Sequence, residues 1–446
     1  MIKNDTIAAV STAMQTAAVG IIRISGLEAF KIIDKLFKAA SKLSIKKFLP
    51  SKLYLGEFFG DGFTDKCMCV IFKEPSSYTG ENMAEIHCHG GVQVVKGILN
   101  SVLKSGARLA DNGEFTRRAF INGKVDLSGA EGIIEMINAE SQGELNAASR
   151  LMMGDLFKLT VEYQGQLTDI ISNLEVLLDY PEEDLLVKSI LELKGEIKKI
   201  STNIKKLITT YSAGKILKEG INMVICGVTN AGKSTLINRL LNFDRAIVTD
   251  IEGTTRDTIE ETLEIANVKF RITDTAGIRE SVDKIEKLGI ERTLNAIKAA
   301  DLILYLIDPK TYNNKENLLI LEKLKGKKVI TILNKSDLKH EGKIPCDIEI
   351  SAKNNTNIEK LKEFIIKAVN LGNLSDRLII TTERHFDVLN RASTQLDEAI
   401  NNFETKPYDV LAFELKQIWD TLGEITGTTA TEEIINNIFA KFCLGK

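Results

Sequence analysis

The spacing of hydrophobic residues changes along the chain, and its first stretch has the pattern of short strands. Apolar runs at Val19–Ile24, Cys67–Phe72 and Met83–His87 have the length and residue types of strands, whereas Ala29–Ala39 has a helical spacing. Turns that contain glycine separate these runs. Residues 1–120 are therefore predicted to form a small α+β domain.

Longer helical patterns follow this first stretch. In residues 121–217 the apolar positions recur with the period of an α-helix, as at Tyr163, Leu167 and Ile170. The same period returns in residues 377–446. The sequence contains only six prolines, so long uninterrupted helices are expected in both stretches.

The part between the two helical stretches, residues 218–376, alternates strand-like runs with helical segments. The strand-like runs include Met223–Cys226, Leu302–Ile307 and Val329–Leu333. This alternation is typical of a doubly wound parallel sheet with helices on both faces. Because a compact α/β domain has its chain ends close together, we interpret it as an insertion into one helical domain built from both helical stretches.

Composition and charge exclude several classes of protein. Hydrophobic residues make up 44% and charged residues 27% of the 446 residues, which argues against a disordered, collagen-like or membrane protein. Lys and Arg number 58 against 61 Asp and Glu, so the net charge is −3 and any contact with RNA must be local. The six cysteines include no C-x-x-C pair, which fits reduced thiols in the cytoplasm.

The uncharged stretch Thr6–Ile22 is not expected to be a signal sequence. Asp5 precedes it, and polar residues interrupt its apolar run. No other stretch is long and apolar enough to span a bilayer. The sequence therefore predicts no membrane association.

The strongest chemical motif is G-x-x-x-x-G-K-S at Gly227–Ser234, which follows an apolar strand and begins a helical segment. In such a loop, backbone N–H groups close around phosphate oxygens. Lys233 is expected to reach the β- and γ-phosphates, and the Ser234 hydroxyl to bind Mg²⁺. The expected nucleotide contacts of this loop are Asn230, Ala231, Gly232, Lys233, Ser234 and Thr235.

A second motif, Asp274-Thr275-Ala276-Gly277, ends the strand-like run Val268–Thr273. Asp274 can hold the hydration shell of Mg²⁺, and the Gly277 N–H can meet the γ-phosphate. Thr254 and Thr255 lie between the two motifs, in a segment expected to close over the nucleotide. We assign Thr255 as the second hydroxyl ligand of Mg²⁺.

A third motif selects the base. Asn334, Lys335 and Asp337 follow a buried strand, and a carboxylate at Asp337 accepts two hydrogen bonds from guanine N1–H and its 2-amino group. Adenine offers neither donor. Ser351, Ala352 and Lys353 are expected to supply a backbone N–H to guanine O6, so the motifs together predict GTP rather than ATP.

The hydrolytic step departs from the Ras pattern, because Ile278 follows the Asp-Thr-Ala-Gly motif where Ras carries a glutamine. Two side chains are candidates for the missing role. Asn230 can offer an amide oxygen to a monovalent cation near the phosphates, beside Lys233. Glu286 can orient water, or it is simply an exposed helix acid; the residues alone leave both interpretations open.

Runs in three regions of the chain resemble the tRNA modification GTPase family MnmE, also called TrmE. The resemblance extends from end to end and keeps the order of the motifs. These motifs are GIIRISG at Gly20–Gly26, SYTGEN at Ser77–Asn82, GEFTRRAF at Gly113–Phe120, NGKVDLSGAEG at Asn122–Gly132, IVTDIEGTTRD at Ile247–Asp257 and FCLGK ending at Lys446.

The resemblance implies a folate-binding and dimerisation domain over 1–120, a discontinuous helical domain over 121–217 and 377–446, and an inserted Ras-like G domain over 218–376. It also implies a homodimer that pairs with a flavoprotein of the MnmG (GidA) type in a heterotetramer. Together the two proteins would convert the wobble uridine (position 34) of certain tRNAs to a 5-aminomethyl or 5-carboxymethylaminomethyl derivative. The one-carbon unit would come from 5-formyl- or 5,10-methylene-tetrahydrofolate.

Several residue roles are implied only by the resemblance. Its folate contacts correspond to Arg23, Glu85, Lys124 and Lys446. Its potassium ligands correspond to Asn230 and to backbone oxygens at Thr249, Ile251 and Thr254, and its water-orienting acid to Glu286. The further nucleotide contacts are Thr249, Asp250, Ile251, Glu252 and Gly253.

Two features of the sequence leave details of the folate site undetermined. Members of the family carry a Pro-Gly-containing segment where this chain has Ala13–Ala18, so the turn and part of the folate or dimer surface can differ. Cys443 is either a nucleophile near the folate or a small, partly buried thiol.

Two other functions share parts of this pattern. A regulatory GTPase of ribosome or RNA assembly would have every nucleotide motif but no folate site. A self-sufficient folate one-carbon transferase would use GTP as a regulator and need no flavoprotein. Folate binding separates the first alternative from the family function, and the need for a flavoprotein separates the second.

Overall fold

The computed structural model describes residues 5–180, 188–244, 260–274, 296–338, 344–369 and 377–446. The chain forms two compact units. One contains Met1–Ile134, Leu151–Lys198 and Thr394–Lys446, and the other contains Glu135–Arg150 and Lys199–Ser393. Each unit thus combines segments that are distant in the sequence.

The N-terminal part of the first unit is a sheet of seven strands in the order β3-β4-β5-β6-β2-β1-β7. Neighbouring strands are antiparallel except for β1 and β7, which are parallel. The strands are β1 (Ile7–Val10), β2 (Val19–Ser25), β3 (Phe37–Ala39), β4 (Tyr54–Phe59), β5 (Thr64–Phe72), β6 (Met83–His89) and β7 (Arg108–Leu109).

One face of this sheet forms the core of the N-terminal part. Residues of β4 alternate strictly between buried and exposed, as expected for a strand with one covered face. Helices α1 (Ala29–Leu36) and α2 (Val92–Lys104) contribute Ile32, Ile33, Val95 and Ile98 to the same core. The short 3-10 turn η1 (Ile45–Lys47) adds Ile45.

The helical pattern predicted over Ala29–Ala39 is wrong in its last turn. The helix α1 ends at Leu36, and Phe37–Ala39 forms β3, which pairs with β4. The reason is local: Phe37 and Ala39 are buried and Lys38 is exposed, which is the period of a strand.

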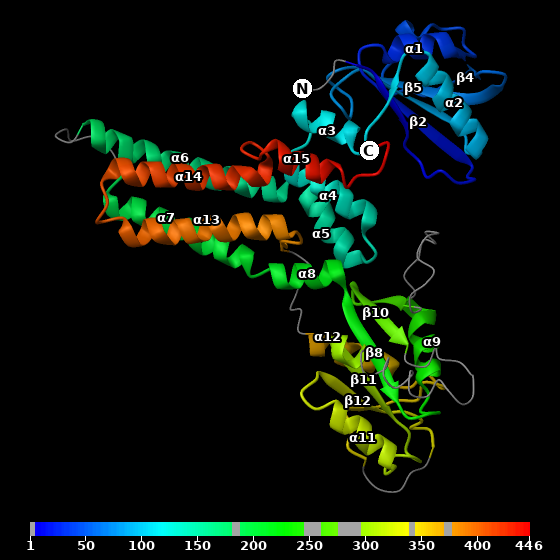
Figure 1. Cartoon of the computed structure of the whole chain (residues 1–446), viewed down its shortest axis with the longest axis vertical. Helices are drawn as coiled ribbons and strands as arrows, with labels where there is room; N and C mark the ends of the chain where they lie inside the picture. The colour runs from blue at the N-terminus through cyan, green and yellow to red at the C-terminus, as the bar shows by residue number, and fades with distance from the viewer. Residues whose placement is uncertain (1–4, 181–187, 245–259, 275–295, 339–343, 370–376) are drawn as a thin grey trace. The chain divides into compact units, whose positions relative to one another are not determined.

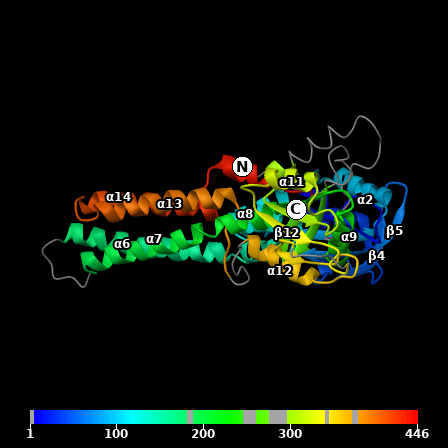
Figure 2. The same ribbon diagram turned by 90° about the horizontal axis from the view of Figure 1, so that it is seen from below.

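Helices from the middle and the end of the sequence pair in the first unit. Helix α6 (Asp155–Asp179) lies beside α14 (Tyr408–Thr426), and the Gln164 side-chain amide donates a hydrogen bond to the carbonyl oxygen of Trp419 at 3.0 Å (Figures 1 and 2). The other helices of the helical stretches are α3 (Glu114–Ile121), α4 (Leu127–Asn138), α5 (Gln142–Met152), α7 (Ile190–Ile208), α8 (Tyr211–Glu219), α13 (Glu383–Asn402) and α15 (Glu432–Phe439).

The second unit contains a six-stranded sheet in the order β13-β12-β11-β8-β10-β9. All neighbours are parallel except β9 and β10, which form an antiparallel hairpin at one edge. Its elements are β8 (Ile221–Gly227), α9 (Lys233–Asp244), β9 (Glu260–Ile265), β10 (Val268–Asp274), β11 (Leu302–Ile307), α11 (Lys315–Lys323), β12 (Val329–Leu333), β13 (Ile348–Glu349) and α12 (Ile358–Val369).

Both faces of this sheet are covered. One core includes Leu236 and Leu240 of α9 and Leu361 of α12, and the other includes Ile297 and Leu324. All six residues of β11 are buried, as expected for a central parallel strand. The doubly wound fold predicted for this stretch is therefore confirmed. Among the described residues, no helix is both long and apolar enough to cross a bilayer.

Candidate functional site

A tight loop joins β8 to α9 at the carboxyl end of the parallel sheet. Gly227 and Gly232 have φ angles of 153° and 98°. A Cβ atom on Gly232 would lie 2.2 Å from the Asn334 side-chain nitrogen, so this position excludes a side chain. The loop can thus bring its backbone N–H groups close to a phosphate.

The charged and hydroxyl groups of this loop lie at its helical end. The Lys233 ammonium donates hydrogen bonds to the carbonyl oxygens of Gly227 at 2.9 Å and Val228 at 3.1 Å, so it lies across the loop. Ser234 and Thr235 are exposed in the first turn of α9. The positive end of the helix dipole and the Lys233 charge both favour an anion there.

The segment after β12 is bound to the same loop. Asn334 is buried; its amide nitrogen donates to the Ala231 carbonyl oxygen at 2.8 Å, and its amide oxygen accepts from the Ala352 N–H at 3.0 Å. The Lys335 ammonium donates to the Asn230 carbonyl oxygen at 2.8 Å. Three motifs that are separate in the sequence therefore form one contiguous site.

Asp337 occupies the position that the sequence assigns to base recognition. Its carboxylate accepts a hydrogen bond from the Ser351 hydroxyl at 2.6 Å, and this bond holds the pKa of Asp337 below its usual value. Asp337 is exposed and is therefore an ionised acceptor at neutral pH. The Ala352 N–H already donates to Asn334, so guanine O6 would share that donor with Asn334.

Two residues of this site were missed by the sequence analysis. Asp308 is 5% exposed and accepts from the Lys335 ammonium at 2.6 Å, which fixes the lysine beside the phosphate loop. An acid directly after the wholly apolar strand β11 was the signal for it. Arg239 of α9 donates to the carbonyl oxygens of Ala352 and Lys353, and no motif distinguishes it from other helix arginines.

Asp274 ends β10, and its backbone is paired with Ile225 of β8, close to the start of the phosphate loop. Nothing further is described of its side chain. The other predicted residues of the nucleotide site lie outside the described residues: Thr249, Asp250, Ile251, Glu252, Gly253, Thr254, Thr255, Thr275, Ala276, Gly277 and Glu286.

A second candidate site lies on the N-terminal sheet. Arg23 of β2 and Glu85 of β6 are cross-strand partners, and the guanidinium Nε donates to the Glu85 carboxylate at 2.9 Å. The Arg23 guanidinium carbon lies 5.2 Å from the centre of the Tyr78 ring and 5.7 Å from that of Phe115. The Arg23 guanidinium thus lies within cation–π range of two aromatic rings.

The environment of Glu85 keeps it ionised. Burial alone would raise the pKa of its carboxyl group, but the hydrogen bond to His87 at 3.2 Å and the charge of Arg23 outweigh burial and lower it. The Arg23 and Glu85 side chains are only 17% and 12% exposed. A ligand with two adjacent N–H donors would therefore meet a charged acceptor in a half-buried position.

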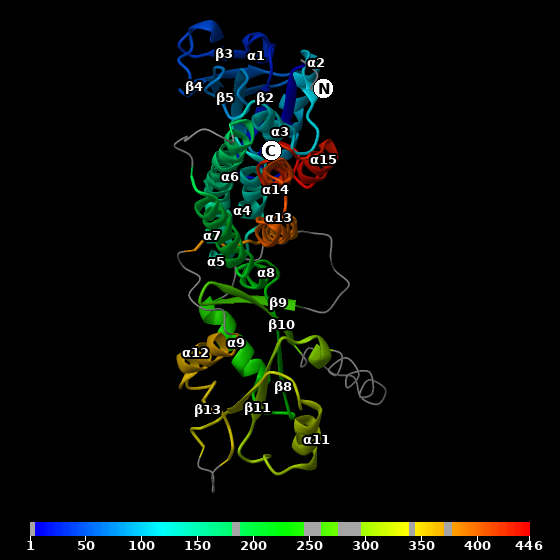
Figure 3. The same ribbon diagram turned by 90° about the vertical axis from the view of Figure 1, so that its left-hand side faces the viewer.

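The end of the chain docks beside this pair. The Phe115 N–H donates to the Lys446 carbonyl oxygen at 3.2 Å, and the Ser11 hydroxyl donates to the Gly445 carbonyl oxygen at 3.2 Å. Figures 1 and 3 both show α15 and the C-terminal end beside α3. Arg23, Glu85 and Lys446 are therefore neighbours, joined through Phe115, although 361 positions separate Glu85 from Lys446 (446 − 85).

The remaining predicted folate residues lie further out. Lys124 is exposed and follows the C-terminal end of α3, where its N–H donates to the Ala119 carbonyl oxygen at 2.8 Å. In the part of the chain that the structure describes, no hydrogen bond or ion pair joins the side chain of Lys124 to Arg23 or Glu85. Cys443 is exposed, more so than the partly buried thiol that was one of the two alternatives for it.

The segment Ala13–Ala18 connects β1 to β2. The Ala17 N–H donates to the Gly90 carbonyl oxygen at 3.1 Å, and the Gly90 N–H donates to the Ala18 carbonyl oxygen at 3.3 Å. A Cβ atom on Gly90 would lie 2.4 Å from the Ala17 oxygen, so this close approach requires glycine.

A buried ion network holds two of the sequence motifs together next to the Arg23–Glu85 pair. Arg118 is 1% exposed, and its guanidinium pairs with Asp5 at 2.7 Å, with Glu114 at 3.0 Å and with Glu81 at 3.1 Å. Three carboxylates offset the cost of burying this one cation. The SYTGEN and GEFTRRAF motifs thus meet at Arg118.

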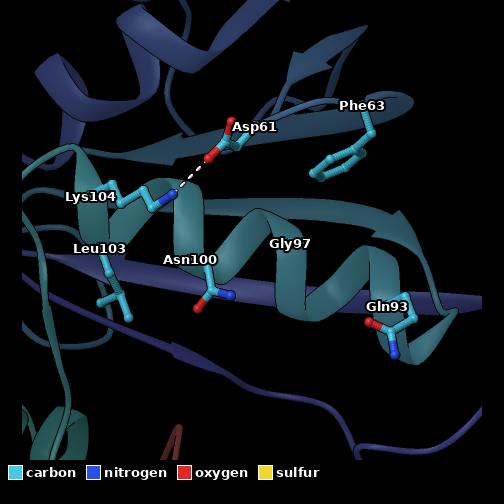
Figure 4. A pocket seen from close by; sticks show the side chains of 7 residues that line it. All are labelled: Asp61, Phe63, Gln93, Gly97, Asn100, Leu103 and Lys104. Carbon is cyan, nitrogen blue, oxygen red and sulfur yellow. Dashed lines mark hydrogen bonds and ion pairs between the residues drawn. The ribbon is translucent and has the colours of Figure 1, made fainter.

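A recess of about 470 Å³ lies beside α2 (Figure 4). Lys104 and Asp61 form an exposed ion pair at 2.6 Å on its wall, and Phe63 lies over Gly97, where a Cβ atom would be 2.7 Å from the ring. None of the predicted site residues lines it.

The phosphate loop, the Asn-Lys-x-Asp segment and the doubly wound sheet together define a P-loop GTPase. Residues 6–124 match the family model of the GTP-binding protein TrmE N-terminus, and residues 127–443 match that of the MnmE helical domain. The chain belongs to the MnmE family of tRNA modification GTPases, and it is a GTP hydrolase.

Curated relatives are similar in sequence to this chain over its full length. The tRNA modification GTPase MnmE of Clostridioides difficile (strain 630) is 42% identical over 459 residues, and that of Alkaliphilus metalliredigens (strain QYMF) is 38% identical over 463 residues; each alignment covers 100% of both chains. The solved structure of Era in complex with MgGDPNP and 16S ribosomal RNA is 28% identical, with a TM-score of 0.26, and covers 33% of this chain and 56% of Era. That score is too low to carry an argument.

Proposed function

We propose that the protein is a potassium-stimulated GTPase that modifies the wobble uridine of certain tRNAs together with a flavoprotein of the MnmG type. The product is a 5-aminomethyl or 5-carboxymethylaminomethyl uridine, and a tetrahydrofolate supplies the one-carbon unit. Membership of the MnmE family supports this proposal. The working form is a homodimer in the cytoplasm, which joins the flavoprotein as a heterotetramer.

The Arg23–Glu85 pair carries the folate part of the proposal. A pterin edge presents adjacent N–H donors that suit the Glu85 carboxylate, and its flat ring suits the neighbouring Tyr78 and Phe115 rings. The glutamate tail of a folate carries carboxylates, for which Arg23, Lys124 and Lys446 are suitable partners. A GTPase that only switches between nucleotide states would have no need for such a site.

The nucleotide cycle is assigned to the second unit. Asn230, Ala231, Gly232, Lys233, Ser234 and Thr235 hold the phosphates, and Asn334, Lys335, Asp337, Ser351, Ala352 and Lys353 hold guanine. Ser234 and Thr255 bind Mg²⁺, which neutralises phosphate charge. Glu286 orients the attacking water.

The proposed potassium ion is bound by the Asn230 side chain and by backbone oxygens at Thr249, Ile251 and Thr254. The chemistry of Asn230 fits this role. Its own carbonyl oxygen already accepts from Lys335, whereas its side chain is exposed at a φ of 63°, so the side-chain amide oxygen is what it can offer a cation. The ion would place positive charge beside Lys233 at the phosphates.

The proposed domains are 1–120 for folate binding and dimerisation, 121–217 with 377–446 for the helical domain, and 218–376 for the G domain. With a net charge of −3, tRNA contact depends on a local surface or on the flavoprotein.

A reconstituted reaction tests the proposal. Purified protein, flavoprotein, undermodified tRNA, 5,10-methylene-tetrahydrofolate and GTP should together give the modified uridine, measured by mass spectrometry of nucleosides. Omitting the folate or the flavoprotein should abolish the product. Modification without the flavoprotein would favour a self-sufficient transferase, and no modification with all components present would favour a regulatory GTPase.

A further inference from the structure

Lys269 of β10 has an environment that the nucleotide motifs do not explain. Its side chain is 4% exposed, yet its ammonium carries a charge that must be balanced by neighbouring oxygen atoms. It donates to the Glu140 carboxylate at 3.0 Å and to the Lys218 carbonyl oxygen at 3.0 Å, and the Glu144 carboxylate lies at 3.7 Å. The buried cation therefore has two hydrogen-bond acceptors and a second carboxylate at ion-pair distance.

The partners of Lys269 come from helical segments outside the sheet. Glu140 lies in the connection between α4 and α5, and Glu144 lies in the first turn of α5. Lys218 lies in the last turn of α8, where carbonyl oxygens carry the negative end of the helix dipole. The Lys269 chain passes over Gly220, where a Cβ atom would lie 3.1 Å from the lysine side chain.

Backbone contacts reinforce the same junction. The Gly143 N–H donates to the Asn267 carbonyl oxygen at 3.0 Å, and the Gln142 N–H donates to the Glu264 carboxylate at 3.2 Å. A Cβ atom on Gly143 would lie 2.2 Å from the Asn267 oxygen. The first amides of α5 therefore face the turn between β9 and β10, and no larger residue fits there.

The strand that carries Lys269 leads directly to the nucleotide site. β10 runs from Val268 to Asp274 of the Asp-Thr-Ala-Gly motif, and it pairs with β8, which ends at the phosphate loop (Figure 1). β9 and β10 form an edge hairpin, so only β8 holds them from within the sheet. The contacts to α5 hold the hairpin at its turn, through Asn267 and Glu264.

We propose that Lys269 and Glu144 are positioning residues for GTP hydrolysis, which fix β10 against the start of α5 and thereby couple this helical junction to the nucleotide site. The coupling is reciprocal. If nucleotide binding changes the equilibrium constant for the contacts between β10 and α5 by some factor, loss of those contacts changes nucleotide affinity by the same factor. This inference needs only the GTPase activity and does not depend on folate or flavoprotein.

The test uses the full-length protein and the variant Lys269→Met, which keeps the length of the side chain and removes its charge. Affinities for GDP and for a non-hydrolysable GTP analogue are measured by fluorescence, and kcat and KM for GTP separately. The ratio of the two affinities should change about fivefold or more, with a change in kcat and little change in KM. Lys104→Met removes an ammonium from an exposed pair elsewhere and should leave every value unchanged.

Two further variants separate positioning from general destabilisation. Glu144→Gln alone should shift the affinity ratio in the same direction, and Glu144→Gln with Lys269→Met should add little to either change, because the two residues act as a pair. Lys269→Arg keeps the charge and should restore most of the wild-type ratio. A merely structural role would lower the melting temperature but leave the ratio of affinities intact, and that result would overturn the proposal.

If Lys269→Met does not fold, hydrogen exchange on the wild-type protein tests the coupling between α5 and the nucleotide site. Protection of the backbone amides at Gln142–Glu144 and at Glu264–Lys269 should change together between the GDP and analogue complexes. Unchanged protection at Gln142–Glu144 in both complexes would contradict the coupling.

Discussion

The two candidate sites of this protein are built in opposite ways. In the nucleotide site, short motifs supply most groups within a few residues of each other, as in Gly227–Ser234 and Asn334–Asp337, and the parallel sheet brings the motifs to one edge. In the N-terminal site, single residues from β2, β6, α3 and the end of the chain meet through strand register and docking. The first kind of site can be recognised from sequence motifs alone. The second can be recognised only by comparison with a family whose site residues are known.

The difference also concerns which atoms bind. Backbone groups dominate the nucleotide site, where Lys233, Asn334 and Lys335 all bond to loop carbonyl oxygens. Side chains dominate the N-terminal site, where Arg23 and Glu85 form an ion pair and two aromatic rings lie near the Arg23 guanidinium. Substitutions in the first site should act on GTP hydrolysis and nucleotide affinity, and substitutions in the second on folate affinity and stability.

The largest expected effect is on hydrolysis. Glu286→Ala should lower kcat by about 10² to 10³ while GTP still binds, because removing one preorganised electrostatic group costs that much and Glu286 is not part of the Gly227–Ser234 motif. The exposed helix acid Glu322 provides the control, and Glu322→Ala should keep wild-type turnover. Normal turnover in Glu286→Ala would show that Glu286 has no role in hydrolysis.

The proposed potassium ion gives a related test of the same step. Turnover should be several-fold faster in potassium than in sodium at equal ionic strength, because sodium is too small for a cage built around backbone carbonyls. Asn230→Lys should abolish this difference by placing a fixed ammonium near the ion. Equal rates of the wild-type protein in the two salts would refute the potassium role.

Base recognition should show the next largest effect. Asp337→Asn should weaken GTP binding by about 10- to 100-fold, since a hydrogen bond to a charged group is worth roughly 1.5–3 kcal/mol. It should favour xanthosine triphosphate, whose changed edge suits an amide. Affinities for both nucleotides are measured by fluorescence, and an unchanged ratio between them would show that Asp337 does not read the base.

Folate affinity should respond more moderately. Calorimetry with 5-formyltetrahydrofolate should show binding that Arg23→Ala weakens by about tenfold, the lower end for one charge-assisted hydrogen bond. Lys124→Ala should weaken it less, because Lys124 is exposed and has no described contact with the pair. If the wild-type protein gives no binding heat, the folate-site assignment is wrong. The altered Ala13–Ala18 segment would then be the first candidate for the cause.

The smallest effect is on stability and its dependence on pH. Because the pKa of Glu85 is lower in the folded than in the unfolded chain, its ionised form stabilises the fold above about pH 4.3, and this stabilisation is lost as pH falls through the folded pKa. Glu85→Gln should cost about 1 kcal/mol in the free energy of unfolding at pH 7. The difference between the two proteins should shrink towards pH 3 in urea titrations; a constant difference would argue against an ionised Glu85.

The sequence predicted the fold classes and the nucleotide motifs because both depend on local patterns. It did not predict Asp308 or Arg239, since their roles arise from which strand and helix lie beside the motif loops. It placed the end of the first helix three residues too late, because pairing with β4 overrode the local helical pattern at Phe37. The contact of Lys446 with Phe115 has no local signal and was not predicted; the family resemblance named Lys446 only as a folate contact.

The central claim is that one chain joins a GTPase to a folate-dependent modification of tRNA. The most direct measurement is nucleoside analysis of tRNA from cells that lack the protein and carry either the wild-type chain, Arg23→Ala or Asp337→Asn. We expect the 5-carboxymethylaminomethyl or 5-aminomethyl uridine at the wobble position to disappear without the protein, to return fully with the wild-type chain, and to stay below that level with either variant. Unchanged modification in the cells without the protein, or full recovery with Arg23→Ala, would contradict this claim.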